Sequence, residues 1–94
     1  MNWNVFVLSQ LDLSCMNLYL LRLTGFTSLR KLSLLRNRIA SLAEMELERC
    51  PELRVLDLRE NGLVDLMAVV SVINSLSQLI YLGMADMLAC YDRD

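Results

Sequence analysis

Two stretches of the chain carry leucines at the same spacing. Residues 53–66, LRVLDLRENGLVDL, and residues 29–42, LRKLSLLRNRIASL, both follow the template L-x-x-L-x-L-x-x-N-x-L, with Ile39 as the only apolar substitution. Two incomplete copies flank this pair, so that copies begin near residues 8, 29, 53 and 79. A repeat with a period of 21 to 26 residues predicts a chain built from stacked copies of one small unit.

Each copy contains an alternating x-L-x-L-x segment, which is typical of a strand with one buried face. Leu56 and Leu58 would point to one side, and Val55, Asp57 and Arg59 to the other. One such strand cannot bury its leucines alone. Stacked copies place equivalent leucines side by side and so predict a continuous parallel sheet with a shared core.

The template resembles that of the leucine-rich-repeat family, and the resemblance covers nearly the whole chain. It implies an α/β fold with a single domain at residues 1–94: a short solenoid with about four parallel strands on the concave face and helical segments on the convex face. It also implies a structural ladder formed by Asn37 and Asn61, because a corner asparagine can offer an amide donor and a carbonyl acceptor to unpaired backbone. The chain is most similar to intracellular members such as phosphatase regulatory subunits, axonemal dynein light chains and ciliary scaffolds.

Two convex helices are expected. Ser41 and Glu44 have the spacing of a capping box, which predicts a helix that ends before Pro51, with Glu44, Glu46 and Glu48 facing outward. Asp65 predicts the start of a second helix. Its apolar stripe would comprise Leu66, Val69, Val70, Ile73 and Leu76. Several β-branched residues between positions 69 and 73 leave a strand as the alternative.

The outer copies depart from the template. Met16 and Met87 stand where the asparagine belongs. Trp3 and Phe6 are expected to cap the first strand, or to form an exposed aromatic anchor. At the other end, either residues 89–91 form a minimal cap or the chain is a piece of a longer protein. An uncapped end would expose apolar surface and strand edge, through which copies could associate.

Composition argues against several function classes. The net charge is −2 and the pI about 5.0, so no general basic field favours nucleic acid or anionic lipid. The chain has no histidine, which is the commonest general base and metal ligand. We therefore predict neither catalysis, nor a cofactor, nor a metal site. No apolar run predicts a membrane span.

The cysteines indicate the compartment. Cys15, Cys50 and Cys90 are odd in number, lack a C-x-x-C pair, and occur in a chain without an N-x-S/T sequon. This pattern favours a reducing, cytoplasmic environment, with the cysteines acting as small buried apolar residues.

The non-leucine strand positions predict the functional surface. On the concave face, basic, apolar and aromatic side chains would form one patch suited to a protein partner, since tyrosine and arginine often dominate such contacts. The patch comprises Lys31, Leu35, Arg36, Arg59 and Tyr81. Alternatively, exposed apolar residues of this kind are ordinary surface.

The predicted function is a non-enzymatic protein–protein interaction module or scaffold, with a cytoskeletal or ciliary role as one setting. An RNA-processing subunit is the alternative, suggested by the sequence Arg36-Asn37-Arg38, although the acidic balance argues against direct RNA contact. A third reading is a fragment or isoform of a larger repeat protein.

Overall fold

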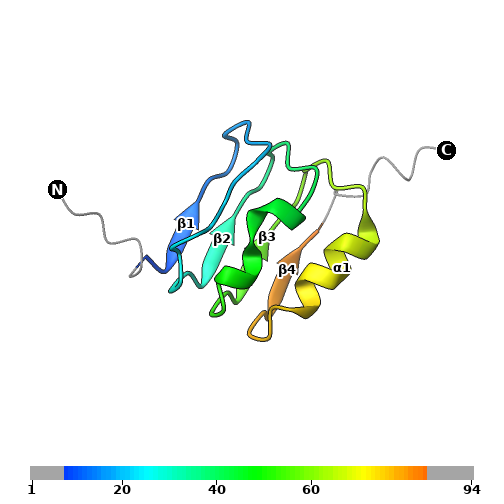
Figure 1. Cartoon of the computed structure of the whole chain (residues 1–94). Coiled ribbons are helices and arrows are strands. Elements are labelled where there is room, and N and C mark those ends of the chain that lie inside the picture. Colours follow the sequence, from blue (N-terminus) through cyan, green and yellow to red (C-terminus); the bar gives the residue numbers. More distant parts are fainter. Residues whose placement is uncertain (1–7, 85–94) are drawn as a thin grey trace.

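Four short parallel strands form one sheet. The computed structural model describes residues 8–84, apart from the side chain of Leu66. The strands are β1 (Gln10–Asp12), β2 (Lys31–Ser33), β3 (Val55–Asp57) and β4 (Tyr81–Gly83), and they lie side by side in chain order, as Figure 1 shows. The predicted α/β class and parallel sheet are therefore confirmed for this part of the chain.

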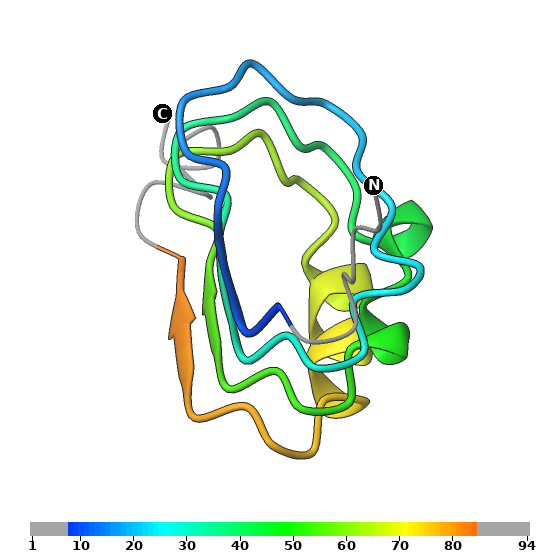
Figure 2. The same cartoon turned by 90° about the vertical axis from the view of Figure 1, so that its left-hand side faces the viewer.

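The leucine spacing determines the register of the sheet. Leu11 pairs with Leu32, Leu32 with Leu56, and Leu56 with Leu82, so the central leucine of every copy lies in one row. The segments between the strands cross to the opposite side of the molecule and return. Figure 2 shows the strands on the left and the helical segments on the right, with the core between them.

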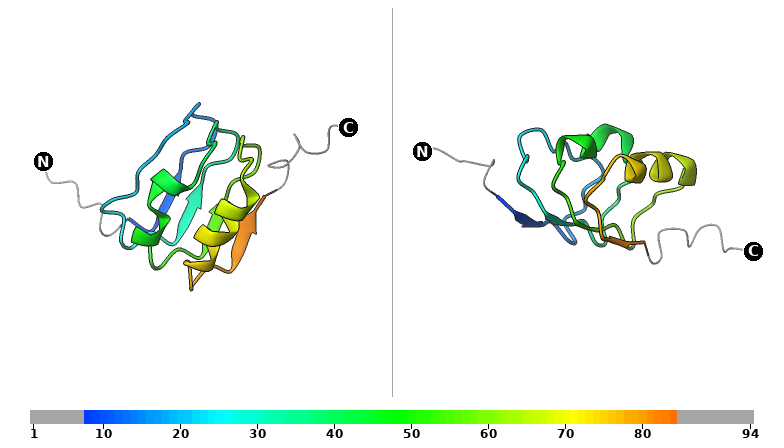
Figure 3. Two further views of the ribbon diagram at one scale, coloured as in Figure 1. Left: turned by 45° about the vertical axis from the view of Figure 1, so that its right-hand side comes forward. Right: turned by 90° about the horizontal axis from the view of Figure 1, so that it is seen from below.

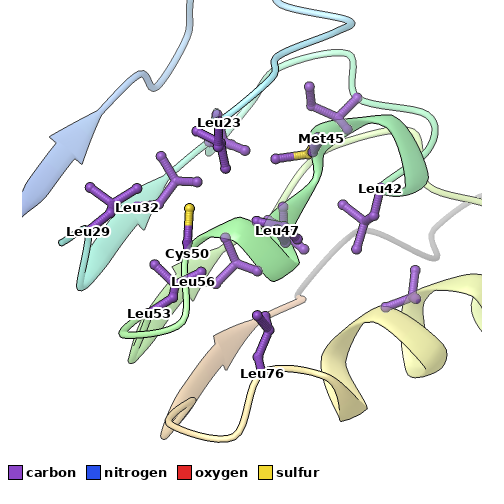
Figure 4. Packing of buried hydrophobic residues seen from close by; sticks show 14 of the residues in the cluster. Leu23, Leu29, Leu32, Leu42, Met45, Leu47, Cys50, Leu53, Leu56 and Leu76 are labelled. Carbon is purple, nitrogen blue, oxygen red and sulfur yellow. The ribbon is translucent and has the colours of Figure 1, made fainter. Parts of the chain in front are cut away.

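The core combines leucines of the template with apolar side chains from the segments between the strands, such as Met45, Leu47 and Cys50. Leu32, Leu34, Leu56 and Leu58 are fully buried, as the alternation predicts. Figure 4 shows such leucines pointing toward one another from the sheet and from the helical side, with Cys50 among them. In the outer strands β1 and β4 the equivalent residues are only partly buried, because within residues 8–84 each of these strands has a neighbouring strand on one side only.

The second predicted helix is present as α1 (Leu66–Asn74), and Figure 3 shows it on the side of the molecule opposite the strands. Asp65 is its N-cap, and its side chain accepts a hydrogen bond from the Ala68 backbone N–H at 3.1 Å. The strand alternative is therefore wrong. One member of the predicted stripe is also misplaced: Val70 is 46% exposed, whereas Val69 is buried.

The prediction of one continuous helix between Ser41 and Pro51 is wrong. Residues 43–49 instead form two single-turn 3₁₀ helices, η2 (Ala43–Met45) and η3 (Leu47–Arg49), separated by Glu46 in a left-handed conformation with φ 60°. The physical reason is that Met45 and Leu47 are both fully buried. Two residues apart on an α-helix they would lie on nearly opposite faces. A break between two short turns directs both side chains inward, and no capping box forms.

The predictions for the chain ends lie outside the described residues. These are the roles of Trp3, Phe6, Met87, Cys90 and residues 89–91. Within residues 8–84, no helix is long and apolar enough to cross a membrane.

Candidate functional site

The exposed face of the sheet carries the predicted site residues. We use the name sheet face for the side of the strands opposite the leucine core. Its register places the row Gln10, Lys31, Val55, Tyr81 beside the row Asp12, Ser33, Asp57, Gly83. Leu35, Arg36, Arg59 and Glu60 follow β2 and β3.

Arg59, just after β3, is held by the carboxylate of Asp57 at the end of that strand. Asp57 Oδ1 accepts hydrogen bonds from Arg59 Nε at 2.9 Å and from the Arg59 backbone N–H at 3.1 Å, and Oδ2 accepts one from Nη2 at 2.7 Å. This two-pronged contact lowers the pKa of Asp57 and raises the pKa of Arg59. The guanidinium is therefore oriented and ion-paired before any partner arrives.

Arg36 is paired in the same manner, but across two copies. Its Nε donates to Glu60 Oε1 at 2.8 Å, and its Nη2 reaches Oε2 at 3.4 Å. This contact lowers the pKa of Glu60 and raises the pKa of Arg36. Both side chains remain solvent-accessible, so the pair contributes more to orientation than to stability.

One backbone feature recurs in three copies at the position just before the template asparagine. Cys15, Arg36 and Glu60 all have left-handed backbone angles, with φ of 59°, 58° and 61°. The repeated conformation brings Arg36 and Glu60 side by side at the end of the sheet face. The sequence carried no glycine that would signal it, and only comparison of equivalent positions could have found it.

Lys31 and Tyr81 lie at separate places on the sheet face. Tyr81 is half exposed on β4, and Val55 stands between it and Lys31 in their row. Lys31 instead borders a hollow of about 270 Å³ lined by Gln10, Leu11, Asp12, Lys31 and Ser33. The predicted patch is therefore divided: Arg59 and Tyr81 belong to the β3–β4 half, and Lys31 to the β1–β2 half.

Asn37 is a structural residue that joins the first two copies. It is 7% exposed, and its Oδ1 accepts from the backbone N–H groups of Met16 at 3.0 Å and Leu18 at 2.9 Å. Its Nδ2 donates to the carbonyl oxygens of Leu13 at 2.9 Å and Leu34 at 3.0 Å. One amide thus satisfies corner backbone in its own copy and in the preceding one.

Asn61 repeats this arrangement one copy later. Its Oδ1 accepts from the Ile39 backbone N–H at 2.9 Å, and its Nδ2 donates to the carbonyls of Leu34 at 2.8 Å and Leu58 at 3.1 Å. Both asparagines are buried and bonded to backbone, as the spacing predicts.

Within residues 8–84, no three His, Cys, Asp or Glu side chains come together as metal ligands. Burial raises the pKa of the Cys50 thiol to about 11, which keeps it protonated and unreactive at neutral pH. The prediction that the cysteines are small buried apolar residues is therefore confirmed for Cys50 and wrong for Cys15, which is exposed in the turn after β1.

Comparison with known proteins gives no relative. No protein-family model, no curated protein and no solved structure matches this chain.

Proposed function

We propose that the chain is a short leucine-rich-repeat solenoid and that it is a non-enzymatic protein-interaction module. The observation that carries the proposal is the composition of the sheet face. Tyr81 is half exposed there beside a pre-oriented Arg59. Tyrosine and arginine are the residue types that most often anchor protein partners.

The repeat register supports a broad binding surface rather than a small-molecule site. Side chains from four strands share one face, and the hollow on it is lined by polar and charged side chains together with Leu11. In our proposal this face is the concave surface. Tyr81 and Arg59 anchor the partner on the β3–β4 half, and Lys31, Leu35 and Arg36 extend the contact toward β1 and β2.

We also propose a scaffold role in the cytoplasm, with the cytoskeleton or cilium as one setting. Direct RNA binding is less well supported, because Arg36 is already paired with Glu60. An anchoring role for a partner protein does not require free cations.

The test is a binding measurement with variants on the two sides of the molecule. A partner captured from cell extract is identified, purified and titrated against the chain. Tyr81→Ala and Arg59→Ala should each weaken binding by about 1–2 kcal/mol or more if they are anchors.

Glu48→Lys is the matched control on the helical side, where Glu48 is exposed. It is a cleaner control than a change at Glu46, which accepts a hydrogen bond from Thr24 and pairs with Arg49. The control should leave affinity unchanged. Loss of binding in Glu48→Lys, with full binding in Tyr81→Ala and Arg59→Ala, would place the interaction surface on the helical side.

A further inference from the structure

Gly83 occupies a crowded position on the sheet face. A Cβ atom added to Gly83 would lie 2.8 Å from Asp57 Oδ1 and 3.2 Å from the Tyr81 hydroxyl oxygen. The first distance is too short for a real contact. Gly83 does not have a positive φ, so its backbone would accept alanine, and the restriction comes from its neighbours alone.

The space at Gly83 determines where the Asp57 carboxylate can lie. The carboxylate that lies over Gly83 is the one that holds Arg59 through Nε and Nη2. The Tyr81 hydroxyl lies beside the same point, so the ring runs along β4 across Gly83. A side chain at position 83 would displace the Asp57 carboxylate, the tyrosine hydroxyl, or both.

On the sheet face, Arg59 and Arg36 are both already paired with carboxylates of the same chain. Asp57 forms an ion pair with Arg59, and Glu60 forms one with Arg36. The accessible groups of the β3–β4 half are the half-exposed ring of Tyr81, part of Val55 and the paired guanidinium of Arg59, whose side chain is 42% exposed. An anionic partner would compete with a carboxylate that already holds two of the N–H donors of Arg59, whereas an apolar or aromatic group would not.

We propose that Gly83 is a positioning residue of the sheet face: it leaves room for the Asp57 carboxylate and so keeps Arg59 ion-paired with it. The face then takes an uncharged apolar or aromatic partner surface and not an anionic one. This inference rests on the proposed function, because it concerns the same surface. Its first test needs no partner.

The first test follows the titration of Asp57 by NMR in the whole chain. In the wild type its pKa should lie below the ordinary value, since Arg59 faces it directly; Asp12 and Glu60 are the other charged side chains that interact with it. Gly83→Ala should raise the pKa toward the ordinary value, because the carboxylate is pushed from the guanidinium. An unchanged Asp57 pKa in Gly83→Ala would overturn the proposal.

Gly62→Ala is the matched control, because a Cβ atom there meets no atom within 4 Å. It should leave the titration of Asp57 unchanged. The control separates a general effect of replacing glycine from the specific effect at position 83.

The second test uses small probes and does not depend on whether Gly83→Ala folds. Inorganic phosphate should give no saturable shift of the Arg59 Nε–H resonance in the wild type, and a saturable one in Asp57→Asn. N-acetyltyrosine amide, an uncharged aromatic probe, should shift Tyr81 and Val55 in the wild type. Saturable phosphate binding at Arg59 in the wild type, or no response to the aromatic probe, would overturn the proposal.

Failure of the proposed function has a different signature. If the titration and probe results are as expected but Tyr81→Ala and Arg59→Ala leave partner affinity intact, the sheet face is organised by Gly83 as inferred and the captured partner binds elsewhere. The probe measurements then still support the inference about the face itself.

Discussion

Two asparagines show how single residues connect the copies. Each amide bonds to backbone of its own copy and of the copy before it, which no apolar or acidic side chain can do with the same donors and acceptors. Their role was predictable because a recurring offset from the leucines separates them from ordinary turn residues.

The first prediction concerns these amides. Asn37→Ala and Asn61→Ala should each lower the free energy of unfolding by about 1–3 kcal/mol, because buried backbone groups lose their partners. Chemical denaturation measures the change. Asn74→Ala is the control, since Asn74 is exposed at the end of α1 and should shift the midpoint little. Unchanged midpoints for Asn37→Ala and Asn61→Ala would mean that the ladder contributes nothing to stability.

The charged residues of the sheet face were predictable in position but not in pairing. Alternation placed Asp57 and Arg59 on the exposed side, and the register placed them near Tyr81. Whether an arginine extends toward solvent or folds back onto a carboxylate depends on rotamers and on the space left by Gly83, which no periodicity records.

The second prediction is a pH dependence. The pKa of Asp57 is lower in the folded chain than in the unfolded one, so unfolding binds a proton once the pH approaches the unfolded-state value. The stabilisation is present above that value and is lost as the pH falls through the folded-state pKa. Denaturation at neutral and at acidic pH should show a smaller loss of stability for Asp57→Asn than for the wild type. An equal loss in both proteins would show that the pair does not contribute.

At the scale of elements, the sequence predicts one of the two helical segments correctly and the other incorrectly. The strand positions and α1 follow from spacing and from the Asp65 cap. The segment at residues 43–49 does not, because a capping-box pattern competes with the burial of both Met45 and Leu47. Packing decided the outcome, and a left-handed residue that no sequence signal marks made it possible.

The third prediction tests the cap of α1. Asp65→Ala should destabilise the chain by about 0.5–2 kcal/mol, since the Ala68 backbone N–H loses its acceptor. Asp65→Asn retains a capping oxygen and should lie close to the wild type. Thermal or chemical unfolding compares the three proteins. Equal destabilisation by both substitutions would indicate that charge, and not capping, is what the helix start requires.

At the scale of the whole molecule, the copies share one buried core. Central leucines of the inner copies are fully buried, whereas their equivalents Leu11 and Leu82 in the outer copies are only partly so. The leucine register thus produces the parallel sheet, the shared core and the face on which Tyr81 and Arg59 meet. If the register were wrong, the site would not exist.

The most direct measurement of this claim compares two leucines. Leu56 is fully buried in β3, and Leu20 is 42% exposed in the first copy. Leu56→Ala should lower the free energy of unfolding by about 2–5 kcal/mol, enough to unfold much of so small a chain, whereas Leu20→Ala should cost far less. Chemical denaturation of the wild type and both variants gives the comparison. A Leu56→Ala protein as stable as the wild type, or no more affected than Leu20→Ala, would contradict the shared leucine core and the sheet face built upon it.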